Sequence, residues 1–262
     1  MQDLWLKDRC IVIIGGTTGI GLSAAQAFIR QGANVVAIGR NPESAEKASA
    51  QLKHARVETG DATAAGTAEK AIENCLRHFG GFDGLYHVAG GSGRKFGDGP
   101  LHEITRDGWD YTLSLNLTSL MLSNQAAVRS FIARKAAGTI LNIGSVLGLS
   151  PSPKYFATHA YAAAKAAAIG FTRSIAAYYA AANIRINLLA PALVETPMDQ
   201  RAANDEKIVS FIKTKQPLDG GRIGSPGDLD GAAVYFMSDL SRFTTGQILT
   251  IDGGWGVSEG QY

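Results

Sequence analysis

Short apolar runs alternate with longer alanine-rich segments along almost the whole of this 262-residue chain. The short runs are rich in Val and Ile and are continuously apolar, whereas a strand with one solvated face alternates apolar and polar residues. Continuous apolar strands separated by helices are typical of a parallel sheet that is covered on both faces. We therefore expect one doubly wound α/β domain spanning residues 1–262, with about seven parallel strands flanked by helices. The strand-like runs are residues 10–14, 34–38, 55–59, 85–89, 139–143, 184–189 and 248–251.

Three irregular segments each follow one of these predicted strands. They are residues 90–100, 148–159 and 191–207, and they hold many of the Gly, Pro and polar residues of the chain. In an open parallel sheet, ligands bind outside the carboxyl ends of the strands. The three segments should therefore line one crevice.

The bulk composition excludes several classes of protein. The net charge is only +2, and no Lys/Arg run suggests a nucleic-acid or lipid surface. No apolar run approaches the length of a membrane span, and the N-terminal decapeptide carries acids and lacks the apolar core and cleavage site of a signal peptide. Cys10 and Cys75 form no metal-like cluster, so we expect free buried thiols and no metal site. We expect a cytoplasmic protein with neither a nucleic-acid nor a membrane partner.

A glycine-rich turn, GGTTGIG, joins the first predicted strand to the first predicted helix. Glycines permit a tight turn and let backbone N–H groups approach a pyrophosphate, and the N-terminus of the helix favours an anion. In this position the turn indicates a Rossmann-type dinucleotide site, although the same turn could also be purely structural. The residues expected to contact the phosphates are Gly15, Thr17, Thr18, Gly19, Ile20 and Gly21.

The residues after the second and third strands bear on which dinucleotide binds. Folds that bind NAD usually place an acid after the second strand, but Gly39 and Arg40 stand there. A guanidinium can pair with the 2′-phosphate of NADP, so NADP(H) is favoured and NAD(H) stays possible. Arg40 could instead be a solvated loop residue. Asp61, followed by Ala62, could accept a hydrogen bond from the adenine amino group or could cap the next helix.

Eight landmarks in a fixed order then resemble the short-chain dehydrogenase/reductase family, in its standard branch. The resemblance covers nearly the entire chain, from the glycine turn to the DGG ending. It implies hydride transfer between a nicotinamide and a carbonyl or secondary alcohol, with Tyr161 as general acid and base. The landmarks are GGTTGIG, GDAT, VAGG, SLNLTS, NIGSVLG, YAAAK, LLAPALVETPM and DGG.

The resemblance also implies roles for individual residues. Ser145, Tyr161 and Lys165 match the catalytic trio of the family, and Asn116 matches its fourth member. The expected contacts on the nicotinamide side are Pro191, Val194 and Thr196, those near its ribose are Ala89 and Gly90, and both Tyr161 and Lys165 are also expected to contact the cofactor.

The chemistry of the Tyr161–Lys165 pair can be stated independently of the resemblance. On a helix, residues four apart share one face, although a surface Tyr–Lys pair would show the same spacing. A phenol has a pKa of about 10, so it exchanges protons slowly near neutral pH. A neighbouring ammonium favours phenolate and lowers this pKa. Ser145 can donate a hydrogen bond to the substrate oxygen, and Asn116 is expected to hold a water that links Lys165 to solvent.

This chain departs from the family pattern after the fourth strand. His87 and Val88 stand where the family usually has two asparagines. A histidine at a strand end near the core is more often structural than catalytic, so we assign His87 no catalytic role.

The expected substrate is a small carbonyl or alcohol compound, and its identity is not encoded in any motif. A helical lid over roughly residues 194–220 would close over it. By resemblance, we expect a homotetramer, or a dimer. An NADP(H)-binding sensor or scaffold without catalysis is the alternative, and it would have no need of a tuned phenol. Candidate substrate contacts are Ser92, Arg94, Phe96, Leu147, Phe156, His159 and Met198.

Overall fold

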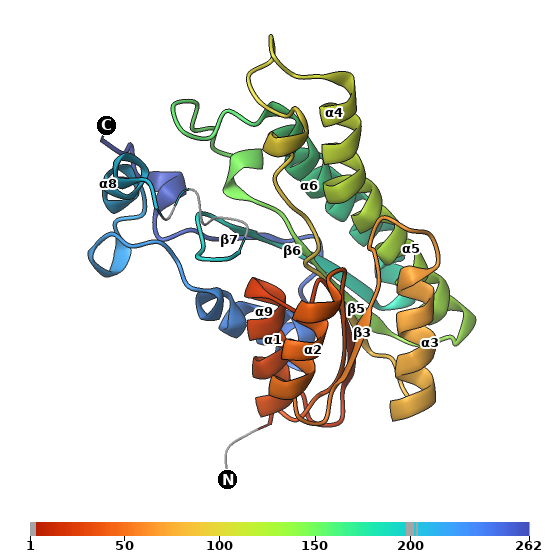
Figure 1. Ribbon diagram of the computed structural model, residues 1–262. Coiled ribbons are helices and arrows are strands. Elements are labelled where there is room, and N and C mark those ends of the chain that lie inside the picture. Colours follow the sequence, from red (N-terminus) through yellow and green to blue (C-terminus); the bar gives the residue numbers. More distant parts are fainter. Residues whose placement is uncertain (1–3, 198–201, 203, 262) are drawn as a thin grey trace.

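The computed structural model describes residues 4–197, 202 and 204–261. Seven parallel strands form one sheet in the order β3-β2-β1-β4-β5-β6-β7, which confirms the doubly wound α/β prediction (Figure 1). The strands are β1 (Cys10–Ile14), β2 (Asn34–Gly39), β3 (Arg56–Thr59), β4 (Gly84–His87), β5 (Gly138–Ile143), β6 (Ile184–Pro191) and β7 (Ile248–Ile251).

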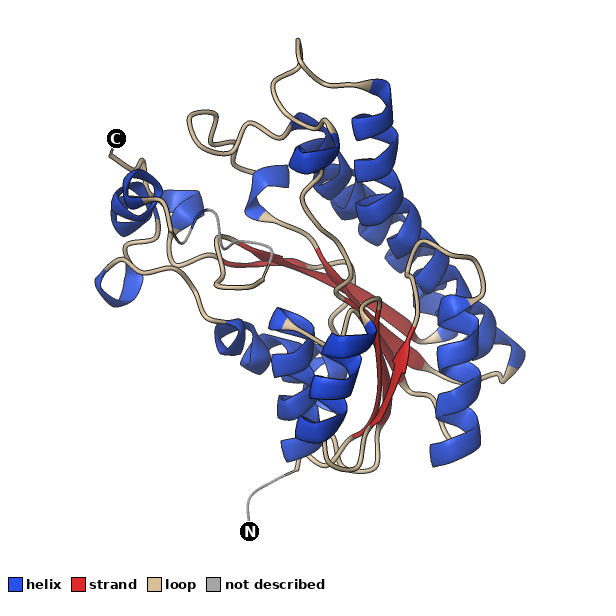
Figure 2. Cartoon of the chain, viewed as in Figure 1, coloured by secondary structure: helices blue, strands red, loops and turns tan. Residues whose placement is uncertain are grey.

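Helices cover both faces of the sheet (Figure 2). The apolar side chains of α1, α2 and α9 pack on one face, and those of α3, α5 and α6 pack on the other. Because both faces are covered, every residue of β1 is buried, which explains its continuously apolar sequence. The helices are α1 (Gly19–Arg30), α2 (Pro42–Gln51), α3 (Thr67–Phe79), α4 (Arg106–Leu113), α5 (Ser119–Ala133), α6 (His159–Tyr179), α8 (Glu206–Lys215) and α9 (Asp230–Met237).

Two central strands end in the same way, and this opens the sheet at its carboxyl edge. The N–H groups of Gly15 and Gly16 both donate to the carbonyl of Ile38 at 2.8 Å, so the chain leaves β1 in a sharp turn. The N–H groups of Val88 and Ala89 likewise both donate to the carbonyl of Ile14, at 2.8 Å. β4 therefore ends at His87, two residues before the end of the apolar run in the sequence.

The strand order reverses between β1 and β4, because β2 lies on one side of β1 and β4 on the other. Such a switch point leaves a crevice at the carboxyl ends of the strands, where ligands bind in open α/β sheets. The three irregular segments identified in the sequence follow β4, β5 and β6, at this same edge.

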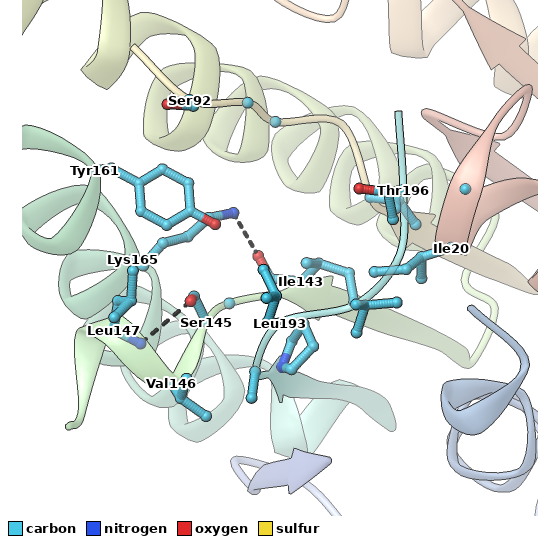
Figure 3. A pocket seen from close by; sticks show the side chains of 18 of the residues that line it. Ile20, Ser92, Ile143, Ser145, Val146, Leu147, Tyr161, Lys165, Leu193 and Thr196 are labelled. Atoms are coloured by element: carbon cyan, nitrogen blue, oxygen red, sulfur yellow. Dashed lines mark hydrogen bonds between the residues drawn. The ribbon is translucent and has the colours of Figure 1, made fainter. Parts of the chain in front are cut away.

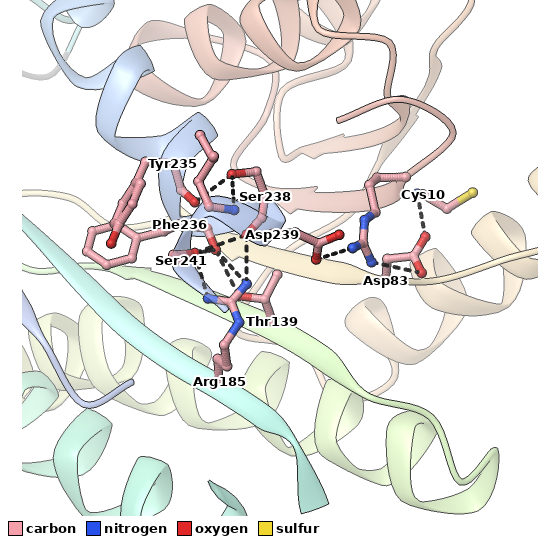
Figure 4. Close-up of polar contacts among 11 residues, drawn as sticks. Cys10, Asp83, Thr139, Arg185, Tyr235, Phe236, Ser238, Asp239 and Ser241 are labelled. Atoms are coloured by element: carbon pink, nitrogen blue, oxygen red, sulfur yellow. Dashed lines mark hydrogen bonds and ion pairs between the residues drawn. The ribbon is translucent and has the colours of Figure 1, made fainter. Parts of the chain in front are cut away.

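The opposite, amino-terminal edge of the sheet is held together by charged and polar side chains (Figure 4). Arg185, near the start of β6, donates to the Ser241 hydroxyl at 2.7 Å and to the carbonyls of Phe236 and Ser238 at 3.1 and 3.2 Å. These carbonyls lie at the C-terminal end of α9, where the helix dipole favours a cation. Asp83 accepts a hydrogen bond from the Cys10 N–H at 2.7 Å just before β4.

Candidate active site

A cavity of about 270 Å³ lies at the carboxyl edge of the sheet, over the switch point (Figure 3). The glycine turn after β1 and the segments after β4, β5 and β6 all contribute to its walls, as the sequence predicts. Of the expected site residues, the lining includes Gly15, Thr18, Gly19, Ile20, Ala89, Gly90, Ser145, Tyr161, Lys165, Pro191, Val194 and Thr196. Those that do not line it are Thr17, Gly21, Arg40, Asp61, Ala62 and Asn116.

The glycine turn forms a cradle that side chains would fill. Gly15 has a φ of 91°, and a Cβ there would lie 2.6 Å from the Ala89 nitrogen. A Cβ on Gly21 would lie 1.9 Å from the Gly15 carbonyl oxygen. Glycine is therefore required at both positions, and the start of α1 stays open to an anion. These features fit the pyrophosphate of a dinucleotide.

The segment after β6 reaches back across the glycine turn. A Cβ on Gly19 would lie 3.1 Å from the Thr196 Cγ2 atom, so these two residues are in contact distance of one another. Pro191 and Val194, from the same segment, line the cavity beside them. The first and sixth strands therefore supply opposite walls of one site.

Ser145, Tyr161 and Lys165 converge on the cavity from two elements (Figure 3). Ser145 follows β5, is 7% exposed, and accepts a hydrogen bond from the Leu147 N–H at 3.2 Å. Tyr161 lies in the first turn of α6, and Lys165 lies one turn later. The Lys165 ammonium nitrogen lies 5.5 Å from the centre of the Tyr161 ring.

Lys165 is a buried amine with one fixed partner. Its side chain is 3% exposed, and its Nζ donates to the Ile143 carbonyl at 3.1 Å. Burial disfavours the charged form and lowers the pKa of Lys165 to about 8. The amine is thus mostly protonated at neutral pH and loses its proton far more readily than an exposed lysine.

Asn116 lies within a π-helical turn, Ser114–Thr118, between α4 and α5. Its Nδ2 donates to the carbonyls of Gly91 and Thr112, both at 2.9 Å, and its Oδ1 accepts from the Gly91 N–H at 3.1 Å. A Cβ on Gly90 would lie 2.8 Å from this Oδ1 atom and 3.4 Å from the Lys165 Nζ. Asn116 and Lys165 thus flank Gly90, and Asn116 fixes the start of the segment after β4.

His87 is a neutral, buried side chain outside the lining of the cavity. It is 1% exposed, its Nδ1 lies 3.0 Å from the Ser123 hydroxyl, and its Nε2 lies 3.4 Å from the Ser119 hydroxyl. Burial, with a smaller contribution from the nearby charge of Lys165, lowers the pKa of His87 to about 3. These contacts favour a role in joining β4 to α5 over a role in proton transfer.

The residues expected to select the dinucleotide lie beyond the cavity, after β2 and β3. Arg40 is exposed directly after β2. A Cβ on Gly39 would lie 1.9 Å from the Thr17 hydroxyl oxygen, so an acidic side chain could not stand there unless Thr17 moved. Asp61 accepts from the N–H and hydroxyl of Thr63 at 2.8 and 2.7 Å, and these bonds, with a smaller contribution from Arg40, lower its pKa.

One of the two alternatives left open for Asp61 is wrong. The carboxylate closes a local turn with Thr63, and the N-cap of α3 is Gly66. Asp61 lies six positions before Thr67, the first residue of α3, and is therefore too far along the chain to be its N-cap. The adenine contact stays a prediction.

One part of the cavity combines an apolar wall with two polar residues. The apolar wall includes Leu147, Phe156, Leu193 and Trp255, and Ser92 and Arg94 line the cavity as well. The Arg94 guanidinium donates to the Tyr155 carbonyl at 3.1 Å, which joins the segments after β4 and β5.

Two of the candidate substrate contacts, Phe96 and His159, are absent from the described lining of the cavity, and a third cannot be placed. Phe96 stacks on Tyr111 with ring centres 3.9 Å apart, and His159 begins α6. Met198 lies outside the described residues.

Two residues of the site were missed in the sequence. Trp255 lies just after β7, is 1% exposed, and packs edge-on against Phe156 with ring centres 5.7 Å apart. Its position after a strand end is the one signal that points to it. Asp98 is 5% exposed, and its carboxylate binds the first turn of α6, where Tyr161 lies.

Neither a metal centre nor a membrane span is found in the part of the chain that the structure describes. No group of His, Cys, Asp and Glu among residues 4–197, 202 and 204–261 could hold a metal ion. None of the helices in these ranges combines the length and the apolar character needed to cross a bilayer. Cys10 and Cys75 are buried free thiols, as predicted.

The strand order, with a glycine cradle at its switch point, defines a Rossmann-type dinucleotide-binding domain. The family model described as "Enoyl-(Acyl carrier protein) reductase" matches residues 15–256. The chain belongs to the short-chain dehydrogenase/reductase family.

Several known proteins are similar to this chain over nearly its full length. It is 34% identical to 2-(S)-hydroxypropyl-CoM dehydrogenase 3 of Xanthobacter autotrophicus, over 95% of this chain and 97% of that protein. It is 32% identical to the 3-oxoacyl-[acyl-carrier-protein] reductase FabG of Chlamydia trachomatis, over 95% and 98%. A short-chain dehydrogenase/reductase structure from Mycobacterium ulcerans superposes with a TM-score of 0.88 at 27% identity, covering 97% of this chain and 92% of that one.

Family membership establishes the type of chemistry. The protein is an oxidoreductase of the hydride-transferring dehydrogenase/reductase type, and its family uses NAD(P)(H).

Proposed function

We propose that the protein interconverts a carbonyl compound and a secondary alcohol with NADP(H), and that Tyr161 is the general acid and base. One observation carries the proposal. Ser145, Tyr161 and the buried Lys165 line the same 270 Å³ cavity as the glycine turn that fits a dinucleotide. A protein that only binds the dinucleotide would need the glycine turn but not this trio.

The cofactor would be held by residues from three strand ends and from α6. Gly15 to Gly21 would surround the pyrophosphate, Ala89 and Gly90 would lie near the nicotinamide ribose together with Lys165, and Pro191 to Thr196 would lie on the nicotinamide side. When bound, the nicotinamide supplies a hydride to the carbonyl carbon or accepts one from the alcohol carbon.

The proton is handled by the chain itself. As hydride adds to the carbonyl carbon, the carbonyl oxygen becomes an alkoxide. The Tyr161 hydroxyl gives its proton to this alkoxide oxygen. The phenolate left behind is stabilised by the Lys165 ammonium, whose Nζ lies 5.5 Å from the ring centre. The oxygen of Ser145 already accepts from Leu147, so its proton is available to the substrate oxygen.

Asn116 serves this site by fixing the segment beside Lys165. Its amide makes hydrogen bonds in both directions with Gly91, next to Gly90, and Gly90 lies close to the Lys165 amine. We propose that a water held by Asn116 links Lys165 to solvent, so that a proton taken from solvent restores the Tyr161 hydroxyl after each reduction.

Arg40 and Gly39 support the preference for NADP(H). Gly39 leaves no room for the acid that would bind an unphosphorylated ribose, because Thr17 occupies that space. The exposed guanidinium of Arg40 can pair with a 2′-phosphate. Asp61, with Ala62 beside it, would contact the adenine.

The substrate would be a ketone or secondary alcohol with an apolar portion. The names of the relatives mention a hydroxypropyl group, a 3-oxoacyl group and, for the 31% identical protein from Eggerthella lenta, a 3beta-hydroxysteroid. The apolar wall around Trp255 would receive the apolar portion. Residues 194–220, which include α8 and the lining residue Ala202, would act as the lid within this single domain.

The proposed assembly is a cytoplasmic homotetramer, or a dimer. The family resemblance is its basis, and light scattering on the purified protein gives the subunit number.

Tyr161→Phe is the decisive experiment. The variant should lower kcat by roughly 100- to 10,000-fold, because the proton donor is lost while the ring stays in place. NADPH affinity, measured by titration, should stay nearly unchanged. The assay measures NADPH consumption against ketones, ketosteroids and 3-oxoacyl thioesters. Wild-type turnover in Tyr161→Phe would refute the mechanism, and tight NADPH binding without turnover of any substrate would favour the sensor or scaffold alternative.

A further inference from the structure

The helix that carries Tyr161 begins without a cap of its own. The residue before α6 is Thr158, and its side chain makes no capping hydrogen bond. The first N–H groups of any helix lack partners within the helix, so they must find acceptors elsewhere or in water.

A segment about 60 residues earlier in the chain supplies these acceptors. The Asp98 Oδ1 accepts from the Ala160 N–H at 3.0 Å, and its Oδ2 accepts from the Tyr161 N–H at 3.0 Å. The Gly99 carbonyl accepts from the His159 N–H at 3.3 Å. Three consecutive N–H groups of the first turn of α6 are therefore bound by Asp98 and Gly99.

Asp98 is itself held in place from several directions. Its N–H donates to the Gly93 carbonyl at 3.1 Å, and its side chain is 5% exposed. Gly93 packs so tightly on α4 that a Cβ there would lie 1.8 Å from the Thr112 hydroxyl oxygen. The segment that carries Asp98 begins at Gly91, and Asn116 binds Gly91 by two hydrogen bonds.

The segment from Gly91 to Gly99 thus joins two parts of the site. One end is bound by Asn116 and the other end binds the backbone of Tyr161. Arg94, in the middle, donates to the Tyr155 carbonyl at 3.1 Å.

We propose that Asp98 is a positioning residue for the reaction, because its carboxylate fixes the first turn of α6 and so sets where the Tyr161 hydroxyl lies relative to Ser145. This inference rests on the proposed function, in which Tyr161 transfers the proton. We assign Asp98 no contact with the substrate, because it is absent from the described lining of the cavity and its two oxygens each accept from the helix. A carboxylate at this end of a helix also interacts favourably with the helix dipole.

Loss of the Asp98 carboxylate should affect kcat most, because displacement of a reacting group by about 1 Å can lower the reaction rate on the order of 100-fold. Asp98→Ala removes both acceptors and should lower kcat by about 10- to 100-fold. Asp98→Asn keeps one acceptor oxygen and should recover part of this loss. The KM for NADPH should change by less than about threefold, because the glycine turn is untouched.

The matched control is Asp110→Asn on α4. Asp110 forms an exposed ion pair with Arg106, so its loss should leave kcat unchanged. All assays are run well below the melting temperature of each variant, and circular dichroism confirms that each is folded. Reduced rates in a folded Asp98→Ala therefore report position and not the amount of folded protein.

The pH profile of kcat separates positioning from a general loss of packing. The charged groups in the described lining of the cavity are Lys165 and Arg94, and His87 behind it is neutral. Removal of the Asp98 charge makes a phenolate at Tyr161 easier to form. The limb of the profile that reports Tyr161 should therefore move to lower pH in Asp98→Asn, by several tenths of a unit.

Two outcomes would overturn the inference. The first is a folded Asp98→Ala variant with wild-type kcat. The second is a lowered kcat in Asp98→Ala, combined with an Asp98→Asn variant that shows neither a partial recovery of kcat nor a shifted pH profile. The result for Tyr161→Phe keeps this test separate from that of the proposed function. If Tyr161→Phe is inactive while Asp98→Ala is fully active, only the positioning role fails. If Tyr161→Phe is active, the proposed function fails first.

Discussion

The two edges of the sheet use polar groups in different ways. At the amino-terminal edge, Arg185 donates to two carbonyls and one hydroxyl at the end of α9, and Asp83 accepts from the start of β1. At the carboxyl-terminal edge, the glycine turn and the start of α1 line a cavity, and Lys165 is buried with its pKa lowered. The first edge satisfies its polar groups within the protein, and the proposed function assigns groups at the second edge to a ligand.

This difference shows where stability and function reside in the molecule. The same strands connect both edges, so a change at one end of β4, β5 or β6 need not disturb the other. We expect variants at the amino-terminal edge to change stability at constant rate, and variants at the carboxyl edge to change rate or affinity at nearly constant stability.

Among the variants that compare the two edges, the largest effect is expected for Gly90→Ala, at the carboxyl edge. The new Cβ would lie 2.8 Å from the Asn116 Oδ1, so the Asn116 side chain beside Lys165 must move. We expect kcat to fall about 100-fold, equivalent to about 2.7 kcal/mol in the barrier, with a small change in melting temperature. Gly231→Ala, where a Cβ meets no atom within 4 Å, is the control. A wild-type rate in Gly90→Ala would contradict the tight packing.

Arg185→Met should have the converse effect, at the amino-terminal edge. The carbonyls of Phe236 and Ser238 lose a charged donor, at a cost of about 2 kcal/mol in the free energy of unfolding. Urea unfolding measures the loss, and kcat at low temperature should be unchanged. As a matched surface change, Asp239→Asn breaks the exposed ion pair with Arg9 and should cost less than about 1 kcal/mol. A large loss of kcat in folded Arg185→Met would show that the two edges are coupled.

Arg40→Ala tests the part of the carboxyl edge that lies beyond the cavity. The loss of one guanidinium–phosphate contact should weaken NADPH binding about tenfold, or about 1.4 kcal/mol, and should leave NADH binding unchanged. Titration with both dinucleotides gives the ratio. Equal weakening of both would argue against contact with the 2′-phosphate.

The smallest effect is a pH dependence that originates at Lys165. Its pKa is lowered to about 8, so the ammonium is present below this pH and is lost as the pH rises through it. The kcat/KM for NADPH-dependent reduction should fall about twofold between pH 7 and pH 8. In Lys165→Arg the guanidinium stays charged, so any residual activity should lack this decline. The same decline in Lys165→Arg would assign it to another group.

The sequence predicted most of the fold because buried parallel strands are encoded locally. The strand-like runs overlapped all seven strands, including β3, whose sequence RVET is neither continuously apolar nor buried, and the glycine turn lay between β1 and α1 as expected. Strand ends were less predictable, since β4 stops where Val88 and Ala89 both turn to the Ile14 carbonyl. That turn depends on a neighbouring strand, which no local pattern records.

The site was predictable where its residues belong to compact motifs. Ser145, Tyr161 and Lys165 were found in this way, and the structure brings them to one cavity. Asp98 and Trp255 were missed because each acts on a segment far away in the chain. The Asp98 bond to Tyr161 spans 63 residues, and Trp255 bonds the Ser150 carbonyl across 105 residues.

The position of Trp255 gives the protein a built-in optical reporter. Its indole is buried in the apolar wall of the cavity, whereas Trp5 is half exposed at the other edge of the molecule. A ligand that fills the cavity changes the surroundings of the Trp255 indole and hence its fluorescence. Substrate candidates can therefore be screened by emission from the unlabelled enzyme, before any turnover is detected.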